Sequence, residues 1–121
     1  SRIEGVMATS MYLNQICIIG DKRKYLSAIV TLDEANVMTY ADNNNIKYDS
    51  FTDLVVQPEI KELVDSEVKK KNSELASFET IKRVVIVPEF TIENAMMTPT
   101  FKLKKNVIMK NYEEKIETLY N

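Results

Sequence analysis

Three short apolar runs along the chain predict the strands of a small sheet. Residues 14–20 form a short apolar run, which fits a strand that is covered on both faces. Residues 25–32 resume as a strand, and the short Gly20-Asp21 connection between the two runs predicts an antiparallel hairpin. The apolar character of the third run, residues 81–87, predicts a central position in the sheet.

Start signals and helical periodicity predict the remaining elements. Asp33 is a good N-cap for a helix through Asp42. Ser50 opens a capping box for one helical turn, and Pro58 suits the first position of a longer helix. Further helices are predicted over residues 1–11 and 106–120. Inward stripes are predicted for the two longer helices, at Ile60, Leu63, Val64, Val68 and Leu75 and at Val107, Ile108, Tyr112, Ile116 and Leu119.

The stripe between Ile60 and Leu75 has two interpretations. We favour contact with the domain's own core, with the intervening charges solvated. The alternative is a free-standing interaction module that docks a partner on this helix. That alternative predicts a large exposed apolar patch there.

The amino-acid composition of the chain excludes several classes of function. The chain has 121 residues, 45% of them hydrophobic, so it is long enough to bury a core of its own. A net charge of −2 argues against nucleic acid as a partner. The absence of histidine excludes Ser-His and Cys-His nucleophile pairs and most zinc sites. Cys17 lies in an apolar run, which predicts a buried thiol in a reducing compartment.

The lengths of the apolar runs predict where in the cell the protein is located. No aliphatic run approaches the ~20 residues that span a bilayer, and no segment resembles a signal peptide. We therefore expect a cytoplasmic protein, with peripheral membrane association of a longer parent protein as the alternative.

The most informative stretch is residues 96–105, Met-Met-Thr-Pro-Thr-Phe-Lys-Leu-Lys-Lys. Pro99 fixes one φ and favours an extended Thr98, so the stretch cannot be helical throughout. Hydroxyl groups on Thr98 and Thr100 can bond the local backbone and stiffen the loop. Such a loop can present the Lys102 ammonium at a defined point. The alternative is an ordinary turn before a lysine-rich helix start.

The segment Met97-Thr98-Pro99-Thr100-Phe101-Lys102-Leu103-Lys104-Lys105 resembles the last motif of the long-chain acyl-CoA synthetases, in the adenylate-forming (AMP-binding) superfamily. Residues 18–30 are similar to the family's C-terminal-domain hairpin, and residues 90–94 to the segment that leads into the motif. Ile3-Glu4 is similar to the pair that opens its first helix, although a vector-derived end is the alternative. The resemblance begins near Ile3 and covers the C-terminal domain only.

The resemblance implies a fold and an activity. With the strand and helix pattern, it implies one α+β domain over residues 1–121, with a small, mainly antiparallel sheet flanked by helices. In the family, a carboxylate attacks the α-phosphate of ATP, and coenzyme A then displaces AMP. Lys102 matches the catalytic lysine. Many superfamily members have glycine before that lysine, where this chain has Phe101; the long-chain subgroup usually lacks the glycine.

Other site residues are implied less directly. Thr98, Thr100, Lys104 and Lys105 are candidates for substrate or nucleotide contacts beside Lys102. Lys22 and Arg23 form either a solvated loop tip or a contact for an anionic ligand or the large domain. No metal ligand is predicted in this chain.

The implied partners belong to a longer protein. They are the chain's own N-terminal adenylation domain, a fatty acid, ATP and coenzyme A, with Mg²⁺ in the full-length enzyme. The isolated chain is predicted to be inactive. The alternatives are another acyl or aryl adenylate-forming ligase and the non-enzymatic interaction module.

Overall fold

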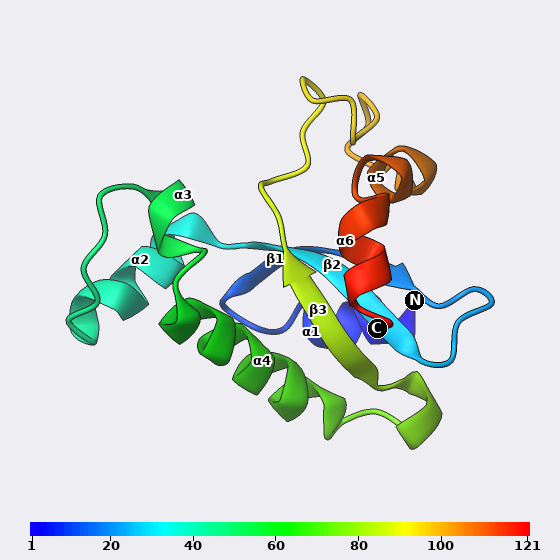
Figure 1. Ribbon diagram of the computed structural model, residues 1–121, viewed down its shortest axis with the longest axis horizontal. Helices are drawn as coiled ribbons and strands as arrows, with labels where there is room; N and C mark the ends of the chain where they lie inside the picture. The colour runs from blue at the N-terminus through cyan, green and yellow to red at the C-terminus, as the bar shows by residue number, and fades with distance from the viewer.

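A three-stranded sheet of order β1–β2–β3 organises the computed structural model, which describes residues 1–121 (Figure 1). Its strands are β1 (Leu13–Ile19), β2 (Leu26–Leu32) and β3 (Ile81–Ile86). The first two strands form the predicted antiparallel hairpin, and β3 joins β2 in parallel. An isolated antiparallel bridge joins Met97 to Leu103. The α+β class with a small sheet and flanking helices is therefore confirmed.

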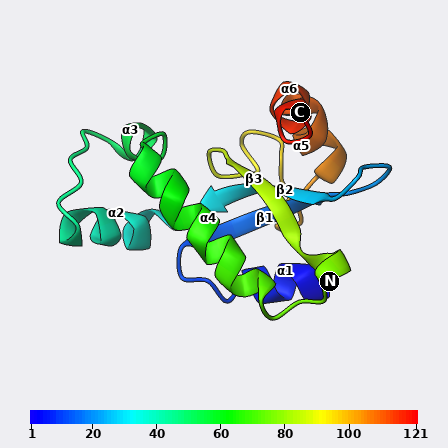
Figure 2. The ribbon, with the colours of Figure 1, turned by 60° about the horizontal axis from the view of Figure 1, so that its bottom comes forward.

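Helices cover both faces of this sheet. They are α1 (Arg2–Met7), α2 (Glu34–Asn43), α3 (Phe51–Leu54), α4 (Pro58–Asn72), the 3₁₀ turn η1 (Ser77–Glu79), α5 (Lys105–Asn111) and α6 (Glu113–Thr118). The helices α1 and α4 lie on one side of the sheet, and α5 and α6 lie on the other (Figures 1 and 2). The pair α2–α3 extends beyond one end of the sheet.

Two buried clusters hold the layers together. The first joins α1, α2, α3 and α4 to the sheet and includes Val30, Val64 and Val68. The second joins the opposite face of the sheet to α5 and α6 and includes Ile29 and Ile116. Alternate β2 side chains enter different clusters, so this strand is buried on both faces.

The predicted helix starts are confirmed. Asp33 caps α2 by accepting the Asn36 N–H at 2.9 Å, and Ser50 caps α3 by accepting the Asp53 N–H at 3.1 Å. Pro58 occupies the first turn of α4, where its missing N–H removes no helical bond. These starts are set by local chemistry.

The predicted central position of residues 81–87 is wrong, because β2 is the central strand and β3 lies at the edge. An edge strand can be strongly apolar when a helix covers it, and here α4 packs beside β3. Lys61 of α4 donates to the Val84 carbonyl at 3.2 Å. The Asn72 side chain pairs with the Ile81 backbone at 2.8 and 2.9 Å.

The predicted helix over residues 106–120 is two helices. Tyr112 has φ −113° and ψ 23°, which breaks the regular helix between α5 and α6. Val107, predicted to face inward, is 40% exposed because Ile108 takes the core position in this short helix.

The predicted helix over residues 1–11 ends at Met7. The Thr9 hydroxyl donates to the Val6 carbonyl at 2.6 Å, and the Ser10 hydroxyl donates to Glu67 at 2.7 Å. These bonds turn the chain towards β1.

Cys17 is buried in the second cluster, as predicted. Burial raises the pKa of its thiol by disfavouring the thiolate. Among the helices of this chain, none combines the length and the apolar character needed to cross a membrane.

The two-faced burial of β2 predicts a large cost for truncating Ile29, which is fully buried. Ile29→Ala is expected to lower the free energy of unfolding by about 2–5 kcal/mol, because it leaves a cavity in the second cluster. Val56→Ala, at a side chain that is 78% exposed, is the control and should change it by less than about 0.5 kcal/mol. Urea unfolding measures both values, and equal losses would contradict the assignment of Ile29 to the core.

Candidate functional site

The candidate site is a tight hairpin between Met96 and Lys104. The Lys104 N–H donates to the Met96 carbonyl at 2.9 Å, and Met97 pairs with Leu103 in an antiparallel bridge. Lys102 precedes this bridge on the returning arm of the hairpin. These pairings fix the register of the two arms, so Lys102 has a defined place on the loop.

Thr98 closes the tip of the hairpin. Its N–H donates to the Lys102 carbonyl at 2.8 Å, and its carbonyl accepts the Phe101 N–H at 2.8 Å. Its hydroxyl accepts the Lys102 N–H at 3.0 Å and contacts the Thr100 hydroxyl at 3.1 Å. The prediction that a threonine hydroxyl bonds the local backbone is confirmed for Thr98, whereas the Thr100 hydroxyl bonds only the Thr98 hydroxyl.

The base of the hairpin is fixed to the protein core. Met96 is only 7% exposed and packs in the second cluster. Just before it, Asn94 accepts the Thr91 N–H at 3.0 Å and donates to the Glu89 carbonyl at 2.9 Å. The Thr91 hydroxyl accepts the Asn94 N–H at 3.0 Å. The segment that leads into the hairpin therefore has a conformation fixed by its own local hydrogen bonds.

The ammonium group of Lys102 is exposed and takes part in none of the ion pairs of this structure. Lys104 and Lys105 follow it, and both are also exposed and unpaired. No acidic residue occurs between Lys102 and Glu113. Residues 102–112 therefore carry only positive charges, on a chain whose net charge is −2, which favours the approach of an anion.

The structure does not bring Lys22 and Arg23 to this hairpin. They lie at the β1–β2 turn, and α5 and α6 separate that turn from the Thr98–Lys102 loop (Figure 1). Lys22 has φ 60° and is exposed at the turn. Any role of these two residues in ligand binding stays a prediction.

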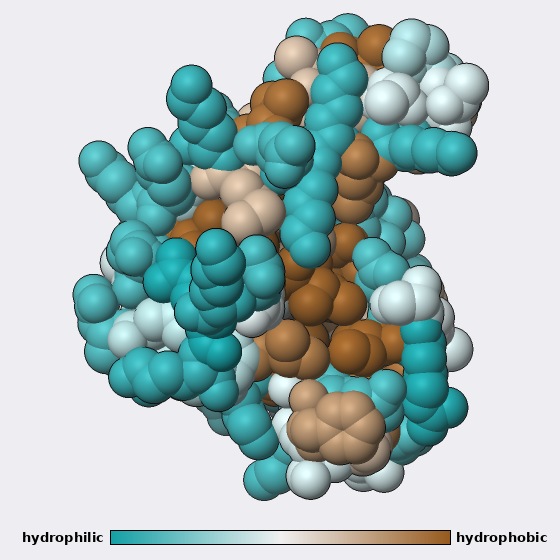
Figure 3. Space-filling model, turned by 90° about the vertical axis from the view of Figure 1, so that its right-hand side faces the viewer, coloured by the Kyte–Doolittle hydropathy of each residue, from teal (hydrophilic) through white to brown (hydrophobic).

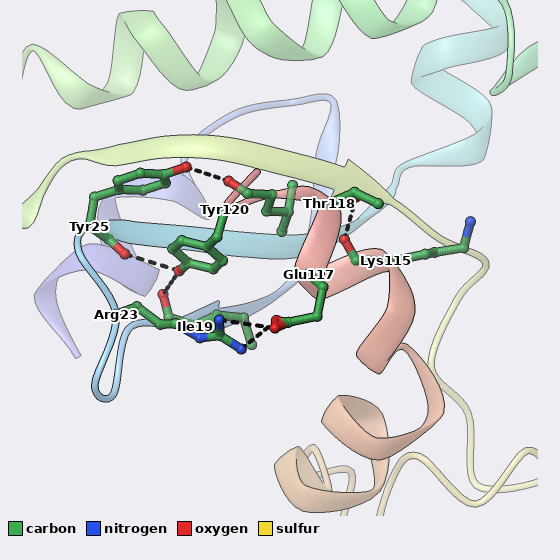
Figure 4. Close-up of polar contacts among 8 residues, drawn as sticks. Ile19, Arg23, Tyr25, Lys115, Glu117, Thr118 and Tyr120 are labelled. Atoms are coloured by element: carbon green, nitrogen blue, oxygen red, sulfur yellow. Dashed lines mark hydrogen bonds and ion pairs between the residues drawn. The ribbon is translucent and has the colours of Figure 1, made fainter.

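Arg23 is engaged within the chain. Its guanidinium lies 2.9 Å from Glu117 and 4.7 Å from the centre of the Tyr120 ring (Figure 4). The hydrogen bond to Glu117 raises the pKa of Arg23. Tyr120 also stacks on Tyr25 at 4.8 Å between ring centres, and its hydroxyl reaches the Tyr25 carbonyl at 3.0 Å. Arg23 therefore holds α6 against the hairpin of the sheet.

Gln15, which is not among the predicted site residues, connects the sheet to the segment that carries Lys102. Its side-chain amide pairs with the backbone N–H and carbonyl of Phe90, both at 2.9 Å. The available signal was the polar pair Asn14-Gln15 at the start of an otherwise apolar predicted strand.

A groove with a volume of about 920 Å³ lies elsewhere, between α4, β3 and α6. None of the predicted site residues lines it. No group of three His, Cys, Asp or Glu side chains is placed to hold a metal ion. Lys102 is thus a surface group, and it needs a second surface to form an enclosed site.

The interaction-module alternative required an exposed apolar patch on α4, and the structure does not show one. Ile60, Val64 and Val68 are buried, and no large exposed hydrophobic residue belongs to α4. Figure 3 shows hydrophobic side chains gathered in a hollow between hydrophilic ones on the right-hand side of the molecule as drawn in Figure 1.

The family model described as "AMP-binding enzyme C-terminal domain" matches residues 1–121. The chain belongs to this family. Long chain acyl-CoA synthetase 7, peroxisomal, of Arabidopsis thaliana is 33% identical over 98% of this chain and 18% of that protein. A long-chain-fatty-acid–CoA ligase of Mycobacterium tuberculosis is 28% identical over 98% of this chain and 20% of that protein. The AMP-binding C-terminal domain thus spans about a fifth of the length of these curated relatives.

A solved structure supports the same family. The A domain of carboxylic acid reductase from Segniliparus rugosus, in complex with AMP and a co-purified carboxylic acid, has a TM-score of 0.74 and 26% identity. The match covers 99% of this chain and 17% of that chain. The expected fold and family are both confirmed.

The hairpin geometry shows a backbone strain at Phe101, the residue before Lys102. Phe101 has φ 65°, in the left-handed region that glycine adopts without a steric penalty. Many members have glycine at this position before the lysine. Phe101 is 70% exposed, so its ring adds little packing to offset the backbone strain, which is roughly 1–2 kcal/mol.

The Thr98 hydroxyl predicts a local effect on hydrogen exchange. Thr98→Val removes the acceptor of the Lys102 N–H, so exchange of this amide is expected to accelerate about tenfold or more. The Lys104 amide, which bonds to Met96, should change little. Hydrogen exchange followed by NMR measures both amides.

Thr100→Val is the matched control, because the Thr100 hydroxyl contacts only the Thr98 hydroxyl. It should leave the Lys102 amide protected. Equal acceleration in both variants would show that the Thr98 hydroxyl does not determine the loop conformation.

Proposed function

We propose that this chain is the C-terminal domain of an AMP-forming long-chain fatty acid–CoA ligase, in which Lys102 assists acyl-adenylate formation. The observation that carries the proposal is an exposed, unpaired ammonium on the returning arm of a hairpin that Thr98 and Met96 fix. The long-chain ligase relatives, at 28–33% identity, support the choice of substrate class.

Lys102 would act on the first half-reaction. A carboxylate oxygen of the fatty acid attacks the α-phosphorus of ATP, the new O–P bond forms, and the bond to pyrophosphate breaks. Two anionic groups must approach each other in this step. A positioned ammonium reduces their repulsion and stabilises charge in the transition state. Lysine suits this role as a compact charge with rotatable donors.

Coenzyme A would enter in the second half-reaction. Its thiolate sulfur attacks the acyl carbon, the thioester forms, and AMP leaves with the electrons of the broken acyl C–O bond. We propose that the domain presents a different face in this step, so Lys102 is not required for it. We further propose that Mg²⁺ accompanies ATP in the full-length enzyme and is not bound by this domain alone.

The proposed partner is the N-terminal adenylation domain of the same protein. The family match and the larger adenylation domain of the structural relative support this partner. The Lys102 loop is exposed in the isolated chain and would be enclosed only against that partner. Cytoplasmic location, with or without membrane association of the parent, stays a prediction.

The alternative is a ligase for aryl or shorter acids. The subgroup-like Thr98-Pro99-Thr100-Phe101-Lys102 sequence, without glycine before the lysine, favours the long-chain assignment. Assays of the parent enzyme with acids of different chain length distinguish the two.

Lys102→Ala in the full-length parent is expected to slow acyl-adenylate formation about 10²–10³-fold, as for the loss of one preorganised donor. Thioester formation from preformed acyl-adenylate should remain. Lys47→Ala, at an exposed lysine outside the hairpin, is the control. Separate assays of the two half-reactions test the proposal, and unchanged adenylation would reject it.

The isolated chain is expected to show no ATP–pyrophosphate exchange, because one exposed hairpin cannot enclose ATP. Exchange above background in a preparation free of other ligases would contradict this. A Lys102→Ala preparation controls for contaminating activity.

A further inference from the structure

We propose that Gln15 is a positioning residue, which fixes the hairpin carrying Lys102 relative to the sheet. The inference rests on the proposed role of Lys102 in adenylation. It assigns a function to a side chain that touches neither substrate nor the reacting atoms.

A bulge in β1 directs Gln15 towards this segment. Leu13 pairs with Leu32 and Ile16 pairs with Val30, so β1 has two residues where β2 has one. Asn14 and Gln15 therefore occupy the bulge. The Gln15 N–H bonds to the Thr31 hydroxyl at 3.0 Å, where a regular ladder would use a backbone acceptor.

The Gln15 side chain makes the pair of hydrogen bonds to the chain that the backbone of a neighbouring strand would otherwise make. Its Oε1 accepts the Phe90 N–H, and its Nε2 donates to the Phe90 carbonyl, both at 2.9 Å. The Thr31 hydroxyl, on a buried residue, donates to the same Oε1 at 2.9 Å. With both amide ends bonded, the orientation of Gln15 is fixed.

These bonds act at both ends of the segment that leads to Lys102. At its start, they hold the backbone of Phe90, whose ring is buried in the second cluster. At its end, Gln15 Nε2 lies 3.9 Å from the sulfur of Met97, which pairs with Leu103 at the base of the hairpin. One side chain thus contacts both the entry to the loop and the base of the hairpin.

This geometry predicts an effect on one half-reaction. A displacement of about 1 Å at a reacting group can cost about 10²-fold in rate. Loss of the Gln15 bonds would let the hairpin shift as a unit without removing the Lys102 ammonium. Adenylation would slow through kcat, whereas the binding of ATP and fatty acid, made largely by the other domain, would change little.

The chain offers a matched control in Asn72. Its side chain makes the same pair of bonds to the backbone of Ile81, at 2.8 and 2.9 Å, between the end of α4 and the start of β3. Asn72→Leu therefore removes an equivalent anchor that does not touch the Lys102 segment. A merely structural role for Gln15 predicts similar effects from the two substitutions.

The test uses the full-length parent with Gln15→Leu, Asn72→Leu and Lys102→Ala. Gln15→Leu is expected to lower kcat of adenylation about 10–100-fold, with KM for ATP and fatty acid within about threefold. In the same Gln15→Leu variant, the rate of thioester formation from preformed acyl-adenylate should stay within about twofold of the unsubstituted enzyme. Asn72→Leu should leave the rates of both half-reactions within about twofold of the unsubstituted enzyme. Thermal unfolding of each variant checks the fold.

Gln15→Glu covers the case in which Gln15→Leu fails to fold. It retains acceptors for the Phe90 N–H and the Thr31 hydroxyl but loses the donor to the Phe90 carbonyl. It should therefore show the same selective loss of adenylation.

The assays distinguish failure of the role proposed for Gln15 from failure of the proposed function. Equal losses in both half-reactions, or unchanged adenylation in a folded Gln15 variant while Lys102→Ala is impaired, would overturn the role of Gln15. Unchanged adenylation in Lys102→Ala would instead overturn the proposed function itself.

Discussion

The burial of β2 on both faces is the constraint on which the rest of the structure depends. One set of its side chains, including Ala28 and Val30, packs with α1 and α4, and Ile29 packs with α5 and α6. Both helical layers are therefore packed on this one strand. Because Met96 belongs to the second cluster, the loop that presents Lys102 is attached to the same strand.

Polar side chains form hydrogen bonds with backbone groups that have no neighbouring strand to pair with. Asn72 and Gln15 each pair with a backbone N–H and carbonyl, and Lys61 donates to the edge of β3. Such bonds satisfy backbone groups that burial would otherwise leave unpaired. They also link irregular segments to the sheet. A surface loop can therefore keep a fixed conformation and still expose a charged group.

The positive groups of the chain differ in what they contact, and this separates candidates that look alike in sequence. Arg23 is held by Glu117 and Tyr120, so its charge serves the packing of α6. Lys102 has no charged partner within the chain. In the proposed ligase, a domain that serves two half-reactions would need fixed internal contacts and an exposed charged group. This chain has two buried clusters and an exposed Lys102.

The sequence by itself determined the local features: the Asp33 and Ser50 caps, the hairpin of β1 and β2, and the loop closed by Thr98. Each depends on residues a few positions apart. Only the tertiary structure decided that β3 is an edge strand, that Arg23 pairs with Glu117, and that Gln15 reaches Phe90 and Met97. The reason is physical: an apolar run reports that a strand is covered but not what covers it, and a side chain's polarity does not identify a partner some 75 residues away.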